Sequence, residues 1–152
     1  MPAPALGLYF EDFPLDQEFV SPGRTVTETD IVMFAGLSGD FNQLHTNAEM
    51  AKGTIFGQRL AHGALILAMT TGLINRMGVI EGTAIAFLGL TWKFSKPVFI
   101  GDTIWAHLKA VKKRAVGAEA GMVITQVSVV NQKDEVVESG ELTVMVRRRP
   151  AQ

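Results

Sequence analysis

Cysteine is absent from this 152-residue sequence, and its absence removes several kinds of chemistry at once. Without a thiol, the chain can form no disulfide, no thiolate metal site and no cysteine nucleophile. The net charge is close to zero, because 14 Lys and Arg stand against 15 Asp and Glu, which leaves −1. A chain so close to neutral carries no electrostatic signature of a nucleic-acid-binding protein.

Long apolar segments are missing as well. The longest run, from Gly63 to Met69, is far shorter than the ~20 residues needed to cross a membrane. The N-terminus has no basic start, and Pro2 and Pro4 interrupt its apolar residues, which does not fit a signal peptide. We therefore expect a soluble, cytoplasmic protein that binds neither membrane nor nucleic acid.

Apolar residues are abundant, at 47% of the chain against 19% charged residues. This composition predicts one globular domain over residues 1–152, with an N-terminal arm at 1–20 and a C-terminal tail at 148–152. We expect Phe10, Phe13, Leu15 and Phe19 to hold the arm on the body. The apolar excess predicts either a subunit interface or a substrate tunnel.

Two capping patterns predict short helices. Thr27-x-x-Asp30 approximates a capping box for a helix of about three turns, which ends at Gly36 or Gly39. Thr46-x-x-Glu49 predicts a second helix that starts just after His45. Residues 40–45 would then be a loop clamped between two helix ends.

The strongest helical segment, 61–77, is apolar on every face in its first half, which predicts a helix wrapped on all sides. Period-2 patterns follow it and indicate strands at 85–94, 103–111, 122–130 and 136–147, the last broken by Gly140. Residues 112–121, with the cations Lys112 to Arg114, are predicted to be a connection. Short connections between strands predict antiparallel pairs, and the whole reads as an α+β two-layer fold.

The polar residues between the first two helices suggest acid–base chemistry. Asp40 and His45 could together take a proton from a water molecule and return one, with the Asn42 amide orienting them. Gly63, at the start of the long helix, offers a backbone N–H for a developing oxyanion. On spacing alone, a structural reading competes equally: Asp40 after Gly39 fits an Asx turn, and His45 fits a surface position.

The remaining candidates are predicted to be structural. His62 would bond backbone near the helix start, and His107 would be an exposed or interface strand residue. The three histidines lack metal-site spacing, so no metal is expected. Arg147 to Arg149 would form a solvated tail, with contact to a ligand phosphate or a neighbouring subunit as the alternative.

Three stretches of the sequence resemble conserved segments of a known family. Ser38-Gly39-Asp40-Phe41-Asn42-Gln43-Leu44-His45, followed by Ala61-His62-Gly63, resembles the S-G-D-x-N-P-[LIV]-H signature and H-G helix start of the MaoC-like hydratase/dehydratase family. Residues 96–104 are similar to the family's downstream strand-turn-strand. The resemblance covers roughly residues 20–147.

The resemblance implies a hotdog fold, in which a curved antiparallel sheet wraps a long central helix, and a homodimer or a dimer-based larger assembly. It implies reversible hydration of a 2-enoyl-CoA to an (R)-3-hydroxyacyl-CoA, as in (R)-specific enoyl-CoA hydratases. Asp40 and His45 would be catalytic, Asn42 would support them, and Gly63 would bind the thioester carbonyl. Gln43, Phe56 and His62 would contact substrate; coenzyme A is part of the substrate, and no cofactor is expected.

Two positions depart from the family pattern. Gln43 replaces the usual Pro, and Ala68 stands where some (R)-specific enoyl-CoA hydratases have Ser. The protein would then work without that hydroxyl or use Thr70 or Thr71 in its place. A hotdog thioesterase and a non-catalytic acyl-CoA-binding subunit are the alternatives. Thioester hydrolysis needs a carboxylate aimed at the carbonyl carbon, and an intact Asp40–His45 pair argues against a scaffold.

Overall fold

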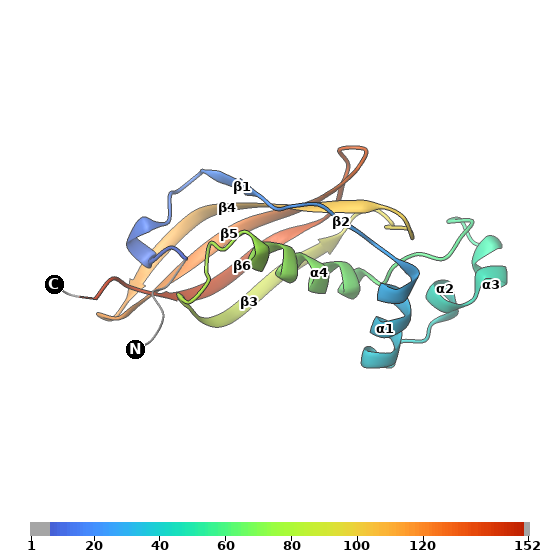
Figure 1. The fold of residues 1–152 in the computed structure, drawn as a ribbon, viewed down its shortest axis with the longest axis horizontal. Helices are drawn as coiled ribbons and strands as arrows, with labels where there is room; N and C mark the ends of the chain where they lie inside the picture. Colours follow the sequence, from blue (N-terminus) through green and yellow to red (C-terminus); the bar gives the residue numbers. More distant parts are fainter. Residues whose placement is uncertain (1–6, 151–152) are drawn as a thin grey trace.

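One long helix, α4 (Gly63–Arg76), packs against one face of an antiparallel sheet, and three short helices lie beyond the end of the sheet (Figure 1). The computed structural model describes residues 7–150. The other elements are η1 (Phe10–Asp12), β1 (Glu18–Val20), β2 (Arg24–Thr25), α1 (Glu28–Ser38), α2 (Gln43–Thr46), α3 (Ala48–Lys52), β3 (Ala84–Phe94), β4 (Thr103–Val116), β5 (Ala120–Asn131) and β6 (Val136–Arg147). This arrangement confirms the predicted α+β class.

The strands follow the order β1-β4-β5-β6-β3, with β2 also paired to β4, and every pair is antiparallel. The meander β4-β5-β6 therefore forms the centre of the sheet, as the short connections predicted. The same prediction is wrong for β3, which pairs with β6 instead of with β4, the next strand in the sequence. Strand β3 lies at an edge, where no other strand within residues 7–150 pairs with its outer side. That edge leaves a row of backbone donors and acceptors available.

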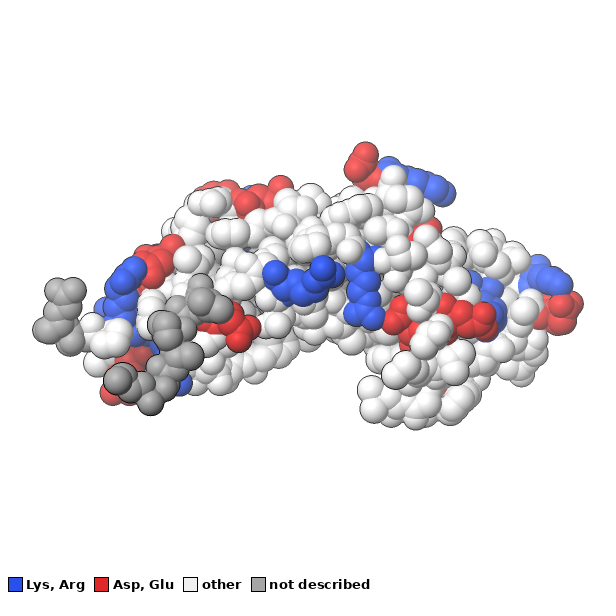
Figure 2. Space-filling view, viewed as in Figure 1, with Lys and Arg blue, Asp and Glu red and all other residues white. Residues whose placement is uncertain are grey.

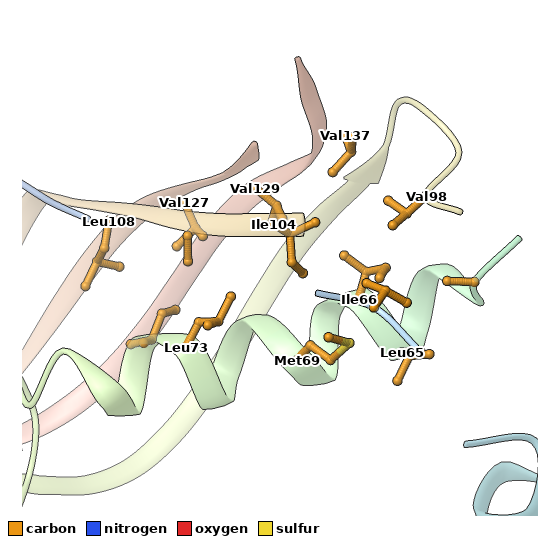
Figure 3. Packing of buried hydrophobic residues seen from close by; sticks show 14 of the residues in the cluster. Leu65, Ile66, Met69, Leu73, Val98, Ile104, Leu108, Val127, Val129 and Val137 are labelled. Carbon is orange, nitrogen blue, oxygen red and sulfur yellow. The ribbon is translucent and has the colours of Figure 1, made fainter. Parts of the chain in front are cut away.

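The core lies between α4 and the sheet (Figure 3). Ile66 and Leu73 from the helix meet Ile104, Val127 and Val129 from the strands, and all five are at most 1% exposed. Burying each such side chain stabilises the fold by ~1.5–3 kcal/mol. This layer of branched apolar residues fixes the helix on the sheet.

The opposite side of α4 is open, so the prediction of a helix wrapped on all sides is wrong for the single chain. Ala64, Ala68, Thr71 and Gly72 are exposed there. The sheet covers one side only, and apolar periodicity could not tell burial by the sheet from burial by another subunit. The exposed residues are small, which would let another surface approach closely.

Two strand predictions also need correction. Strand β4 runs to Val116, so residues 112–116 are strand rather than connection. A bulge between Ala110 and Lys112 breaks the alternation of apolar and polar residues there. Lys113 donates to the carbonyls of Phe10, Glu11 and Phe13. Gly140 does not interrupt β6. A Cβ at Gly140 would overlap the backbone oxygen of Thr91 and lie 2.6 Å from Cε3 of Trp92, so the glycine admits both the backbone of β3 and the indole.

The arm and the tail hold each other. Arg148 Nε lies 2.8 Å from Glu11 Oε1, and Arg149 pairs with Asp12. Arg147 and Arg149 are exposed, as predicted for a solvated tail, but Arg148 and Arg149 are held by the arm and are not free in solvent. Hydrogen bonds from the Arg148 side chain and the Arg149 backbone N–H lower the pKa of Glu11 to about 2. Of the side chains expected to anchor the arm, Phe13 is buried, and Phe10 and Phe19 pack on the core clusters.

Leu15 does not anchor the arm, because it is 49% exposed. Residues 1–6 and 151–152 of the predicted arm and tail lie outside the described residues. Charged side chains gather in small groups of mixed sign on the face in Figure 2, with broad uncharged surface between them. Among the described helices, none combines the length and apolar character that crossing a membrane demands.

One carboxyl group lies within the apolar interior. Glu138, on β6, is 2% exposed, and Trp92 Nε1 donates a 2.7 Å hydrogen bond to its Oε2. Burial raises the pKa of this carboxyl from its ordinary value of 4.5 to about 7, and the bond from Trp92 opposes the rise. A raised pKa means that the folded protein holds this proton more tightly than the unfolded chain does.

The pKa of Glu138 predicts that stability falls as pH rises. Its contribution is fully present below 4.5, where both states are protonated, and is lost as pH passes about 7. A shift of this size corresponds to on the order of 3 kcal/mol. We expect Glu138→Gln to flatten the unfolding free energy between about pH 5 and 8, measured by urea denaturation at several pH values.

Glu135→Gln is the matched control. Glu135 is partly exposed, and hydrogen bonds from Lys96 and then Asn131 lower the pKa of its carboxyl, so its effect on stability falls below pH 4.5. This variant should keep the wild-type slope between about pH 5 and 8. Equal slopes for wild type and Glu138→Gln would contradict the assignment.

Candidate active site

Helix α1 ends directly before Asp40, the first of the candidate residues. Thr27 and Asp30 form the predicted capping box at its start, and Gly39 ends it in the left-handed conformation, with φ of 79°. Glycine adopts this conformation without the steric penalty of a Cβ. The chain then turns so that Asp40 is exposed, and the Asp40 Oδ1 accepts a 3.2 Å hydrogen bond from the backbone N–H of Asn42.

His45 lies in a helix rather than in the predicted loop. The four-residue helix α2 carries it, capped by the Asn42 side chain, and Asn47 rather than Thr46 caps α3. The Nδ1 of His45 lies 2.8 Å from the carbonyl oxygen of Leu60. A carbonyl can only accept, so Nδ1 carries the proton, and the neutral ring keeps an unprotonated Nε2 as a base.

His62 lies directly beneath His45. The two rings stack with centroids 3.8 Å apart and planes 27° apart, and His62 is only 3% exposed. Its Nε2 donates to the backbone carbonyl of Asp40 at 2.9 Å, while its buried Nδ1 has no partner among the described residues. His62 thus joins the Asp40 loop to the start of α4, as its predicted structural role requires.

Asp40, His45 and His62 each bring a polar side-chain atom within 4.8 Å of the others. Two groups that hydrogen-bond the same water molecule stand about 4.5 Å apart, so a carboxylate oxygen of Asp40 and a ring nitrogen of His45 lie close enough to share one water. A metal ion bound to both histidines would have to lie in both ring planes. Stacked planes do not meet within the ~2 Å of a metal–nitrogen bond.

Gly63 opens α4 beside this cluster. As the first helical residue, it has a backbone N–H without an intrahelical partner, at the positive end of the helix dipole. A Cβ at this position would lie 2.5 Å from Cδ1 of Phe94, so a larger residue would displace that ring. Gly63, Phe56 and Glu138 line a pocket of about 410 Å³, whose lining includes Leu60 and Ala61 next to His62 but none of the three cluster residues themselves.

The structure places the other predicted residues differently. Asn42 reaches Asp40 through its backbone, and its side-chain Oδ1 accepts from Leu44 N–H as the α2 cap. The Gln43 side chain bonds Asn47. Thr70 and Thr71 both donate to carbonyls of their own helix, Thr70 to Ile66 and Thr71 to Ala68.

Three features of the pocket were missed by the sequence reasoning. The Leu60 carbonyl is a backbone group, and no side-chain pattern could reveal it as the partner of His45. Phe94 and Glu138 lie much later in the sequence than the motif, on β3 and β6. A register shift between Val129 and Val130 precedes Glu138 in the pairing of β5 with β6, so alternation alone could not place the carboxyl inside.

Three comparisons bear on the family. A model described as "MaoC like domain" matches residues 12–133. An (R)-specific enoyl-CoA hydratase from Rhodospirillum rubrum is 35% identical over an alignment of 150 residues that covers 93% of this chain and 93% of that protein. The X-ray structure of a monoamine oxidase regulatory protein from Archaeoglobus fulgidus matches with a TM-score of 0.89 at 38% identity, over 95% of this chain and 97% of that one.

A Mycobacterium tuberculosis structure described as a double hotdog fold matches with a TM-score of 0.85 over 99% of this chain and 47% of that one, and at 19% identity it bears on the fold alone. It confirms the hotdog architecture expected from the resemblance. The family model spans far more than half of the chain, and the Rhodospirillum rubrum relative matches nearly end to end. This chain therefore belongs to the MaoC-like family of hydratases and dehydratases, which are hydro-lyases with the hotdog fold.

Proposed function

We propose that this protein catalyses the reversible hydration of a 2-enoyl-CoA to an (R)-3-hydroxyacyl-CoA, or the reverse dehydration. The observation that carries the proposal is the pairing of Asp40 with His45 at a separation suited to one shared water, beside the Gly63 N–H. The relative from Rhodospirillum rubrum, named as an (R)-specific enoyl-CoA hydratase, supports the same reaction class.

Asp40 and His45 would hold and activate the water. As the water oxygen bonds to C3 of the enoyl group, the pair takes one proton from it. The electron pair of the C2=C3 bond moves toward the thioester carbonyl, and the proton then passes to C2. The product has gained one hydroxyl and one hydrogen, and the Asp40–His45 pair returns to its starting state.

Gly63 would stabilise the intermediate enolate. Its N–H points from the helix start, where the dipole favours negative charge on the carbonyl oxygen. Removing one such donor typically raises a barrier by roughly 3 kcal/mol, so its position beside the shared water matters for rate. The Leu60 carbonyl contributes by holding His45 in the tautomer with a basic Nε2.

Substitution of either catalytic residue should abolish hydration without unfolding the protein. We expect Asp40→Asn and His45→Gln each to lower kcat/KM by at least ~100-fold, the usual contribution of acid–base catalysis. The thermal midpoint should change little, because Asp40 is exposed and His45 is only half-buried. Loss of enone absorbance with crotonyl-CoA measures hydration, and thiol release is followed in the same samples.

Glu49→Gln serves as the control, since this exposed carboxylate on α3 pairs with Lys52 and lies outside the candidate site. It should retain wild-type activity. Thiol release without loss of the enone would replace hydration by thioester hydrolysis, and neither signal in the wild type would favour a binding subunit. Full activity in Asp40→Asn or His45→Gln would remove that residue from the mechanism.

We also propose that the protein works as a dimer or a dimer-based assembly. The free edge of β3 and the exposed side of α4 lie on the same part of the molecule, where Phe87 is 54% and Phe94 is 61% exposed. Apolar surface of this kind is what subunit interfaces cover. A second copy pairing along β3 would also satisfy its backbone groups.

Analytical ultracentrifugation tests this assembly. The wild type should sediment as a dimer or larger, whereas Ala68→Glu, which places a charge on the exposed side of α4, should weaken association by at least ~10-fold. Gln126→Glu, on an exposed position of β5, should behave as the wild type. A monomeric wild type at micromolar concentration would contradict the proposal.

A further inference from the structure

Two pockets follow one another along the space between α4 and the sheet. The first, called the outer pocket, has a volume of about 410 Å³ and includes Gly63, Ile66, Phe94 and Glu138 in its lining. The second, called the inner pocket, has about 90 Å³, and is lined largely by apolar side chains from Ile74 on α4, Phe87 on β3, and Leu142 and Val144 on β6. Both pockets use α4, β3 and β6, so they belong to one trough.

The strand register places Trp92 between the pockets. Along β6, Glu138 pairs with Phe94 at the outer pocket, Gly140 pairs with Trp92, and Val144 pairs with Phe87 at the inner pocket. Strand residues rise ~3.4 Å each, so Gly140 stands about 7 Å from Glu138 and about 14 Å from Val144. The indole lies on Gly140 and packs against the main core cluster. It stands behind Glu138, which lines the outer pocket and accepts its hydrogen bond.

Glu138 fixes the orientation of this indole. Its Oε2 accepts from Trp92 Nε1 at 2.7 Å, and its side chain lines the outer pocket. Burial raises the pKa of its carboxyl to about 7, so the carboxyl is held in an environment that disfavours its charge. A buried acid with a single indole partner stabilises the fold poorly, which points to a role in positioning.

We propose that the Glu138–Trp92 pair is the inner wall of the acyl pocket and restricts this protein to short-chain 2-enoyl thioesters. The inference rests on the proposed function. With the thioester carbonyl at the Gly63 N–H, the acyl chain runs along the outer pocket toward Glu138 and Trp92. A longer chain reaches the inner pocket only if the indole leaves its place on Gly140.

The chain-length profile tests this wall. The wild type should hydrate crotonyl-CoA with a higher kcat/KM than trans-2-octenoyl-CoA. Trp92→Leu should join the two pockets. This variant should raise the octenoyl-to-crotonyl ratio of kcat/KM by at least ~10-fold. Burial of four more methylenes sets an upper bound on the order of 100-fold. Glu138→Gln keeps the indole and an acceptor oxygen, and its ratio should stay near the wild-type value.

Trp105→Leu is the matched control, because this indole packs on Gly23, away from both pockets, and its ratio should not change. Calorimetric Kd values for butyryl-CoA and octanoyl-CoA give a readout that does not require catalysis, and Trp92→Leu should favour octanoyl-CoA there too. If the leucine variant does not fold, Trp92→Phe replaces it as the test. Its ring is smaller than the indole, so it should give a smaller rise in the octenoyl-to-crotonyl ratio.

The two failures are distinguishable. If the wild type hydrates crotonyl-CoA but the ratio is unchanged in Trp92→Leu and Trp92→Phe, the proposed wall is wrong and the proposed function is unaffected. A wild type that prefers octenoyl-CoA, or an equal rise in Trp105→Leu, would overturn the wall in the same way. A wild type that hydrates neither thioester would overturn both.

Discussion

Two hydrogen bonds from imidazole rings to backbone carbonyls hold the candidate site together. His45 donates to Leu60 and His62 donates to Asp40, and the two rings stack on each other. Because a carbonyl only accepts, each bond fixes the proton on one ring nitrogen. The neighbouring Ala61 N–H bonds the Val98 carbonyl, so this small cluster is tied both to α4 and to the segment after β3. The basic nitrogen, the carboxylate and the helix start are thereby placed together.

Helix ends were predictable where local chemistry decides them. Thr27 with Asp30 and Gly39 acted as the spacing indicated, because their bonds are within the helix itself. The prediction failed at Thr46, since the adjacent Asn47 offers an equally good cap and the Thr46 hydroxyl bonds the carbonyls of Phe41 and Asn42. It failed again beyond residue 111, where contacts with the N-terminal arm, which local patterns cannot include, stabilise a strand rich in cations.

The site was predictable only in the residues that the sequence motif contains. Asp40, His45 and Gly63 could be chosen because a motif links them to acid–base and oxyanion chemistry. The stacking of His62 and the Leu60 carbonyl depend on a fold that brings distant backbone together, and Trp92 and Glu138 meet across 46 residues of chain. In the proposed wall these two residues set substrate size, so the sequence motif predicts the reaction type and the tertiary structure determines the selectivity.

The most direct test of water addition by this site is product analysis after incubation of crotonyl-CoA in D₂O. In the proposed mechanism Asp40 and His45 act on one water, so the product should be (R)-3-hydroxybutyryl-CoA with a deuterium introduced at C2 and no free CoA thiol. Chiral chromatography gives the configuration at C3, and NMR gives the position of the label. Formation of the (S) product, or of free CoA with unreacted enoate, would contradict the account.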